Sequence, residues 1–288
     1  MKRLSISDRL FVWIVYAILT ISTLAVALPF LYVVMVSFST KAEVLSRGFF
    51  LLPKTWSLDA YQYLFREKNF LLSFRNSLWI TLVGTVVNIA LTSMMAYGLS
   101  KPWIVGRRAL NILVLFTMLF NGGIIPTYLV VNTFGLLNSY WAIWLTAAIA
   151  PFNLIVMRGF FQSFPPELEE ASRIDGCSEF YLFRKIVLPL STPAIATFTL
   201  FYLVQNWNTY FNALIYLNDS TKWPLQVFLR QMLIEAADSS MTLEIEGFEF
   251  GPPVKMATVV ATALPLLLIY PFFQKHFNQG MMLGSVKG

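Results

Sequence analysis

The chain has 288 residues, of which 57% are hydrophobic and only 12% are charged, and its formal net charge is +6. Soluble domains carry about 25% charged residues, so a soluble fold this apolar would have too little polar side chain to cover its surface. The 16% aromatic content excludes a disordered chain, and the single cysteine excludes a disulfide scaffold. The basic residues are scattered along the chain, which disfavours nucleic-acid binding and leaves a polytopic membrane protein.

Six long runs of the chain contain no Asp, Glu, Lys or Arg. Each is close to or above the roughly 20 residues that a helix needs to cross the hydrocarbon core. The alternating pattern of a membrane β-barrel is absent. We therefore predict an all-α polytopic fold with six transmembrane helices, at Phe11–Phe38, Asn76–Leu99, Ala109–Val131, Tyr140–Met157, Pro189–Leu217 and Met256–Gln274.

The distribution of basic residues predicts the orientation of these spans. In a six-span topology the N-terminal segment and the second loop lie on one side, and their basic residues are Lys2, Arg3, Arg9, Lys101, Arg107 and Arg108. The third loop, Asn132–Ser139, carries no charge. The positive-inside rule then places both termini in the cytoplasm. The loop 39–75 is basic yet external in this topology, and a helix over Leu58–Phe65 lying in the interface would reduce its weight.

Several kinds of site are missing from the sequence. Spans without ionisable residues disfavour a proton relay, although sodium coupling through carbonyl and hydroxyl oxygens stays open. There is no GxxxxGK[ST] phosphate loop, so ATP binding by that route is not expected. One histidine, His276, and one cysteine offer neither a metal site nor a catalytic pair. We expect no enzyme activity, and the acidic segment Asn218–Lys255 is interpreted as a solvated loop.

The fourth loop, Arg158–Leu188, predicts two short helices joined by a turn. Pro165 and Pro166 suit the start of a helix, and glutamates in its first turn favour the positive end of its dipole. Asp175-Gly176 is a turn signal, because glycine adopts positive φ without steric cost. The second helix is predicted to be amphipathic and to continue into the fifth span, with one face formed by Phe180, Phe183 and Val187.

This loop resembles the EAA loop of type I ABC-importer permeases, written E-A-A-x3-G-x9-I-x-L-P. Ser172 replaces the second alanine, a small-for-small departure. The residues that match at the family's spacing are Glu170, Ala171, Gly176, Ile186, Leu188 and Pro189. The resemblance implies the type I importer fold, in which this loop couples the chain to an ATPase.

Other segments extend the resemblance over most of the chain. Asn76-Ser77-Leu78 is similar to the opening of the permease domain, and Trp207-Asn208 and the tail Gly280–Gly288 are similar to carbohydrate importers. The segment Phe120–Tyr128 is similar to a branch that takes up oligosaccharides released from plant or algal polysaccharides. The implied organisation is an N-terminal region with the first span at 1–71, a permease domain at 72–274 with its coupling loop at 158–188, and a cytoplasmic tail at 275–288.

The resemblance also implies the partners. An extracytoplasmic solute-binding protein would deliver sugar to a heterodimer of this chain and a second permease subunit in a bacterial-type cytoplasmic membrane. Two ATPase subunits would bind ATP and magnesium, so this chain would need no cofactor of its own. Glu170 and Ala171 would lie on the coupling helix, Gly176 would make its turn, and the tail Gln279–Gly288 would also reach the ATPase.

Polar and aromatic residues inside the spans are the candidates for contact with a sugar. In a continuous fifth helix Asn208 and Asn212 would share a face, as would Asn206 and Tyr210. Asn206, 17 residues beyond Pro189, would lie roughly 25 Å along that helix, in its outer half. Hydrogen bonding between helices is an equally weighted alternative for such asparagines. The candidate residues are Asn206, Trp207, Asn208, Tyr210 and Asn212, with Asn153 in the fourth span.

The third span is expected to break or kink. Broken helices line binding sites in some transporters, while a purely structural kink is the alternative. The residues of the predicted break are Asn121, Gly122, Gly123 and Pro126. The sequence thus predicts the permease subunit of an importer for a sugar or oligosaccharide, with an acidic sugar left open. The alternatives are an importer for an amino acid, peptide or other small solute, and a stand-alone secondary carrier.

Overall fold

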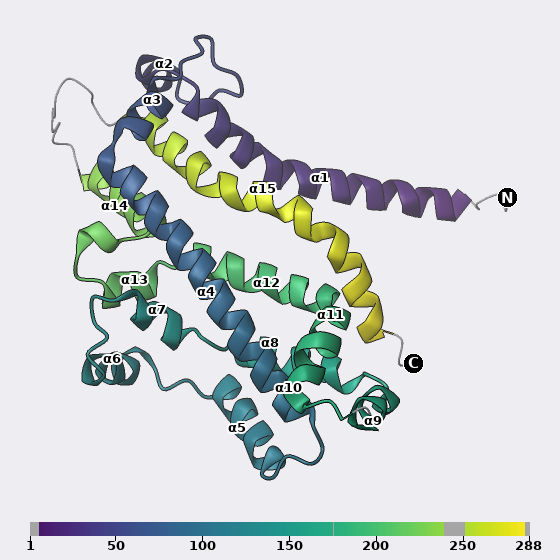
Figure 1. Cartoon of the computed structure of the whole chain (residues 1–288). Helices are drawn as coiled ribbons and strands as arrows, with labels where there is room; N and C mark the ends of the chain where they lie inside the picture. Colours follow the sequence, from purple (N-terminus) through teal and green to yellow (C-terminus); the bar gives the residue numbers. More distant parts are fainter. Residues whose placement is uncertain (1–5, 175, 239–250, 286–288) are drawn as a thin grey trace. The chain divides into compact units, whose positions relative to one another are not determined.

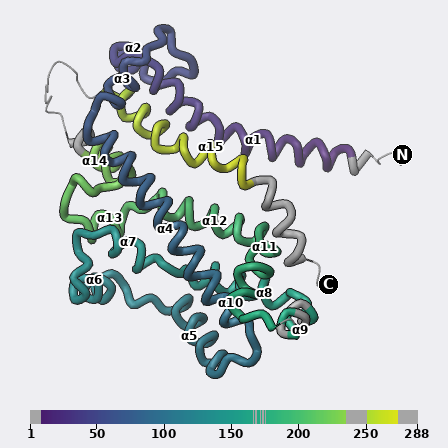
Figure 2. Tube along the Cα trace, viewed as in Figure 1, coloured from purple at the N-terminus to yellow at the C-terminus, as the bar shows by residue number. Residues whose placement is uncertain are grey.

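The computed structural model describes residues 6–174, 176–238 and 251–285 of the chain (Figures 1 and 2). Every regular element in these ranges is helical. The α-helices are α1 Ile6–Ser37, α2 Lys41–Arg47, α3 Asp59–Arg66, α4 Lys68–Ser100, α5 Arg107–Leu119, α6 Ile124–Thr133, α7 Tyr140–Thr146, α8 Pro151–Gln162, α9 Pro166–Ile174, α10 Glu179–Leu182, α11 Leu188–Leu190, α12 Thr192–Trp207, α13 Phe211–Tyr216, α14 Leu225–Asp238 and α15 Pro252–Ser285. A π-helix at Phe183–Val187 and a 3-10 turn at Ser220–Lys222 complete the set in this part of the chain.

Three of the described helices, α1, α4 and α15, are each long and apolar enough to cross a membrane. Three bent helix pairs satisfy the same criterion together, which gives up to six spans. The predicted all-α polytopic fold is therefore confirmed. The segment Asn218–Lys255, interpreted from the sequence as a loop, contains α14 and the start of α15, so that interpretation is wrong for its described part. Glu244, Glu246 and Glu249 of this segment lie outside the described residues, and α15 continues through the predicted tail as far as Ser285.

The chain divides into two compact units, Met1–Phe70 with Leu229–Leu264, and Leu71–Phe228 with Pro265–Gly288. In the first unit, no residue in the most apolar stretch of α1 is buried. The hydroxyls of Ser37 and Tyr61 lie 2.8 Å apart and connect α1 to α3. The helix α3 covers most of the segment for which the sequence predicts an interfacial helix.

A buried carboxylate organises the loop after α1. The backbone N–H groups of Lys54 and Thr55 donate to Glu43 at 2.7 and 3.1 Å, and the Arg47 guanidinium donates at 2.5 Å. The hydrogen bond from Lys54 is the main reason that the pKa of Glu43 lies below its ordinary value. The side chain of Glu43 therefore connects α2 to the backbone of Lys54 and Thr55, later in the same loop.

The second unit contains most of α4, which runs as one unbroken helix of 33 residues (Figure 1). It begins at Lys68, eight residues before the predicted Asn76, so the span is longer than its uncharged core. Polar residues at helical spacing form a buried stripe along it: Ser73, Asn76, Ser77, Thr81, Thr85, Asn88, Thr92 and Ser93. The side chains of such a stripe can form hydrogen bonds with backbone groups that neighbouring helices leave unpaired.

The third, fourth and fifth predicted spans are bent. The angles are 118° between α5 and α6, 54° between α7 and α8, and 83° between the α10–α11 segment and α12. The fourth and fifth predicted spans are therefore each built from more than one helix, and the continuous fifth helix expected from Pro189 is not present. Helix breaks expose backbone N–H and C=O groups, which in a membrane must find partners within the protein.

The polar stripe of α4 supplies many of these partners. The Asn88 amide donates to the carbonyls of Ala147 and Ala148 at 2.7 and 2.9 Å, where α7 ends. Next along the chain, the Ala150 N–H donates to the Tyr202 hydroxyl at 3.1 Å, and that hydroxyl lies 2.7 Å from Thr92 Oγ1. These contacts explain why an apolar span can bend at this point.

Candidate functional site

The predicted helical hairpin is present over residues 166–190, from α9 to α11. The backbone N–H of Cys177 donates to the carbonyl of Ser172 at 3.0 Å, and Gly176 has a φ of +73°. This is the geometry of a Schellman cap, in which the left-handed residue is usually glycine. The Ser178 hydroxyl then accepts from the Tyr181 N–H at 3.2 Å and caps α10. Asp175 lies outside the described residues.

The second arm of the hairpin differs from the single amphipathic helix that the sequence predicts. It consists of α10, the π-helix and α11. Phe183 and Val187 are buried as expected, but Phe180 is 66% exposed and Leu182 is buried instead. The wider π-turn breaks the 3.6-residue period on which the prediction depended.

An apolar cluster fixes this second arm in place. The hairpin contributes Leu182, Phe183 and Val187, and α4, α8 and α12 contribute most of the remaining buried members. Ile186 and Leu188 of the EAA pattern are half-buried against the same cluster, while Pro189 is exposed. Ile186 and Leu188 therefore help to pack the second arm against three spans.

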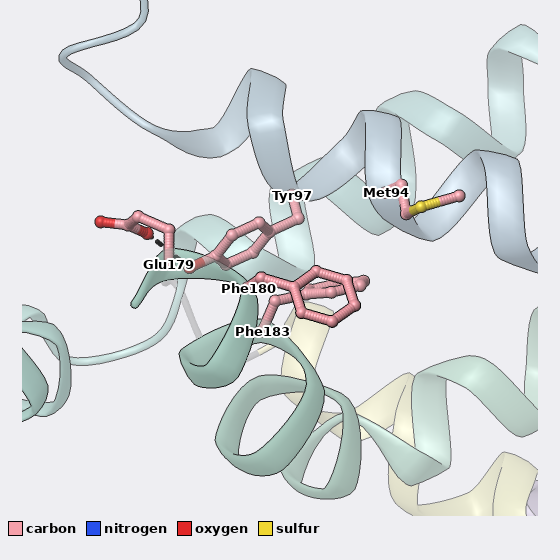
Figure 3. A pocket seen from close by; sticks show the side chains of 5 residues that line it. All are labelled: Met94, Tyr97, Glu179, Phe180 and Phe183. Atoms are coloured by element: carbon pink, nitrogen blue, oxygen red, sulfur yellow. Dashed lines mark hydrogen bonds between the residues drawn. The ribbon is translucent and has the colours of Figure 1, made fainter. Parts of the chain in front are cut away.

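Two polar contacts join the hairpin to the C-terminal end of α4. The Tyr97 hydroxyl donates to Glu179 Oε2 at 3.0 Å (Figure 3). Lys101, the residue after α4, forms an ion pair with Glu169 of α9. Neither contact is predictable from the sequence, because the partners are 82 and 68 residues apart.

An open pocket of about 230 Å³ lies beside these contacts. Figure 3 shows that Tyr97 and Met94 of α4 line it together with residues of the second arm. Those residues are Glu179, Phe180 and Phe183.

The first helix of the hairpin has one exposed face. Glu167, Glu170 and Ile174 recur at helical spacing and are exposed, Ile174 to 86%. Ser172 is buried, and the side chain of Ala171 lies outside the described part of the chain. This face therefore presents one large apolar side chain flanked by carboxylates.

The fifth-span candidates do not lie on one helix. The helix α12 ends at Trp207, Asn208 is its C-cap, and α13 begins only at Phe211. The prediction that Asn208 and Asn212 share a helix face, and likewise Asn206 and Tyr210, is therefore wrong. The segment 205–212 has no charged residue, glycine or proline, so the sequence carries no clear signal for this break.

Asn206 takes the alternative role of hydrogen bonding between helices. It is buried, and its amide donates to Asn88 Oδ1 at 2.8 Å and to Thr85 Oγ1 at 3.3 Å. A Cβ atom at Gly84 would lie 3.0 Å from the Asn206 side chain, so glycine permits this close approach of α4 and α12. Trp207 is also buried and stacks edge-on against Phe74, with ring centroids 6.1 Å apart.

Of the four remaining candidates, three are more accessible and one is buried. Asn208 is exposed, and its Oδ1 accepts from Gln226 Nε2 at 3.2 Å. Tyr210 and Asn212 are half-buried, and Tyr210 packs against the apolar cluster around Ile80. Asn153 is buried in the first turn of α8.

The segment for which the sequence predicts a break in the third span separates α5 from α6. The chain is non-helical over 120–123, and Asn121 Oδ1 accepts from the Gly123 N–H at 2.9 Å. Gly123 has a φ of +87°, and both Gly122 and Gly123 are exposed. Pro126 lies inside the first turn of α6, where its missing N–H is not needed by the helix.

Comparison with known proteins gives concordant results. Residues 82–283 match the family model described as binding-protein-dependent transport system inner membrane component. The chain is 51% identical to the polygalacturonan/rhamnogalacturonan transport system permease protein YtcP of Bacillus subtilis (strain 168), over 98% of this chain and 99% of that protein. It is 53% identical to the protein LplC of the same strain, over 91% of this chain and 89% of LplC.

A solved structure is similar over nearly the whole chain. It is a chain of a bacterial ABC transporter involved in the import of the acidic polysaccharide alginate. The sequence identity is 34% and the TM-score 0.88, with 96% of this chain and 100% of that chain covered.

Proposed function

Since the chain belongs to the family of binding-protein-dependent transport system inner membrane components, we propose that it is the permease subunit of an ATP-driven importer for oligosaccharides. The observation that carries the proposal is the 166–190 hairpin, whose turn and packing agree with a rigid coupling element. The relatives that are named for saccharide transport support the substrate class.

The exposed face of α9 is the proposed contact with an ATPase subunit. Glu170 would lie at this contact, Ile174 would fill an apolar recess, and Gly176 would set the angle between the two arms. ATP and magnesium would be bound by two ATPase subunits, and this chain would carry no cofactor. With both termini in the cytoplasm, the hairpin would face those subunits, and the tail 279–288 would make a further contact.

The other proposed partners lie in and outside the membrane. A second permease subunit would complete a heterodimer in the cytoplasmic membrane, and an extracytoplasmic solute-binding protein would deliver the sugar. Relatives are named for polygalacturonan/rhamnogalacturonan transport and for alginate import, and the latter is described as acidic. We therefore propose an acidic oligosaccharide as the substrate.

Uptake by the whole reconstituted complex tests this function. We expect uptake of uronate oligosaccharides into proteoliposomes only when ATP and the loaded binding protein are both present. The methyl esters of the same oligosaccharides, which lack the negative charge, serve as the matched substrates and are expected to be taken up more slowly. Uptake without ATP would instead indicate a stand-alone carrier, and ATP-dependent uptake of amino acids or peptides alone would contradict the sugar assignment.

Alanine substitutions of Asn208 and Asn206 are expected to have different effects, the first on uptake kinetics and the second on thermal stability. Asn208 is exposed, so Asn208→Ala is expected to raise the KM for uptake by about 2- to 10-fold, the loss of one neutral hydrogen bond to sugar, with unchanged thermal stability. Asn206→Ala is expected to lower the melting temperature, because its amide bonds two residues of α4. Unchanged uptake kinetics of Asn208→Ala for every tested sugar would remove Asn208 from the substrate pathway.

A further inference from the structure

Lys101 is an unusual residue for a loop between two spans because it is buried. Only 4% of its surface is exposed, and its ammonium group pairs with Glu169 of α9. The same ammonium lies 4.2 Å from the ring centroid of Tyr97 and 5.4 Å from that of Trp103. Burial of a charge is costly unless it is paired, so this lysine is held in one position by its carboxylate and by two aromatic rings.

The second contact comes from the preceding turn of α4. Tyr97 is four residues before Lys101, and its hydroxyl donates to Glu179 of α10. Its ring also lies 4.8 Å from that of Phe183, in the π-helix. The C-terminal end of α4 therefore holds both arms of the hairpin, one on each side of the Gly176 turn.

The rest of α4 reaches the places where other spans bend. Asn88 bonds the end of α7, and Thr92 reaches Tyr202 of α12 and, through it, the start of α8. Because α4 is a single helix without an internal proline, displacement of its C-terminal end is transmitted along its length.

We propose that Lys101 and Tyr97 are positioning residues that clasp the coupling hairpin to α4. Through this attachment, α4 transmits the movement of the hairpin to the bent spans. This clasp comprises the Lys101–Glu169 ion pair and the Tyr97–Glu179 hydrogen bond. The inference rests on the proposed function, and it assigns a coupling role to residues outside the EAA pattern.

A charge swap in the reconstituted complex tests the ion pair. Lys101→Glu and Glu169→Lys are each expected to lower the number of sugar molecules transported per ATP at least tenfold, while the ATPase subunits stay bound and hydrolyse ATP. The double variant restores opposite charges and is expected to return this ratio to within about threefold of the wild type. Arg108→Glu makes the same charge change at an exposed residue in the first turn of α5 and is expected to leave the ratio unchanged.

A milder variant separates the clasp from folding. Tyr97→Phe keeps the ring and removes only the hydroxyl that bonds Glu179, so we expect an unchanged melting temperature and about a threefold lower transport ratio. Normal ratios in the single variants, failure of the double variant to recover, or loss of the ATPase subunits from Lys101→Glu would each overturn the clasp. A wild-type complex that takes up no sugar with ATP and loaded binding protein would instead overturn the proposed function.

Discussion

Gly176→Pro is expected to leave the protein inserted in the membrane but to abolish ATP hydrolysis stimulated by the sugar-loaded binding protein. Gly176 has a φ of +73°, whereas the proline ring fixes φ near −65°. The two arms of the hairpin would then leave the turn in a different direction. The turn lies outside the predicted spans, so insertion itself is not expected to change.

A graded series at this position separates backbone conformation from side-chain size. Apart from its two chain neighbours, no atom of the described residues lies within 4 Å of a Cβ placed on Gly176, so a side chain has room and only the conformation is penalised. Alanine in the left-handed region costs about 1–2 kcal/mol, whereas asparagine adopts it more readily. We expect stimulated ATP hydrolysis to fall in the order glycine, asparagine, alanine, proline.

The measurement is ATP hydrolysis by the reconstituted complex with and without loaded binding protein, together with retention of the ATPase subunits during purification. Equal hydrolysis by the wild type and all three variants would remove the Gly176 turn from the coupling element. Loss of membrane insertion by the proline variant alone would show that the turn is needed for folding, and the asparagine and alanine variants would then decide the question.

The sequence predicted the parts of the fold that depend on composition and local pattern. Uncharged runs of sufficient length located the spans, and the glycine after a run of glutamates located the turn of the hairpin. Both signals are local, because membrane thickness and left-handed backbone geometry each constrain a short segment of chain.

The bends and the contacts of α4 were not predictable in the same way. The end of α12 at Trp207 lies in an uncharged span, between Gln205-Asn206 and Asn208-Thr209, and polar residues of this kind also occur within continuous membrane helices, so the sequence does not indicate the break. The bond from Asn88 to Ala147 joins residues 59 apart, and one sequence does not show such pairs. The π-helix likewise alters which residues of its segment are buried, and the composition of that segment does not predict a π-helix.

Asn88→Leu is expected to destabilise the protein more than any other single change in the polar stripe of α4. The Asn88 side chain is 1% exposed and makes three hydrogen bonds, to Ala147, Ala148 and Asn206. Leucine fills a similar volume but leaves two backbone carbonyls and one amide without these partners. Each such bond is worth between about 0.6 kcal/mol, the average in membrane proteins, and about 2 kcal/mol for a buried group left unpaired.

The expected loss is therefore between about 2 and about 6 kcal/mol of unfolding free energy. It should appear as a lower melting temperature in detergent and faster proteolysis near the α7–α8 bend, because the carbonyls of Ala147 and Ala148 would be released. Asn206→Leu removes bonds between side chains but orphans no backbone carbonyl, so a smaller loss is expected. The double variant should lose less than the two single variants together, since they share one hydrogen bond.

Asn208→Leu is the matched control, because it makes the same change at an exposed asparagine. Its melting temperature is expected to stay near that of the wild type. If Asn88→Leu has the same melting temperature as this control, the bend at Ala147–Ala150 is stabilised by apolar packing and not by the polar stripe of α4. A melting temperature that falls only in Asn88→Leu and Asn206→Leu would instead establish that the stripe stabilises the bent spans, as transmission of hairpin movement along α4 requires.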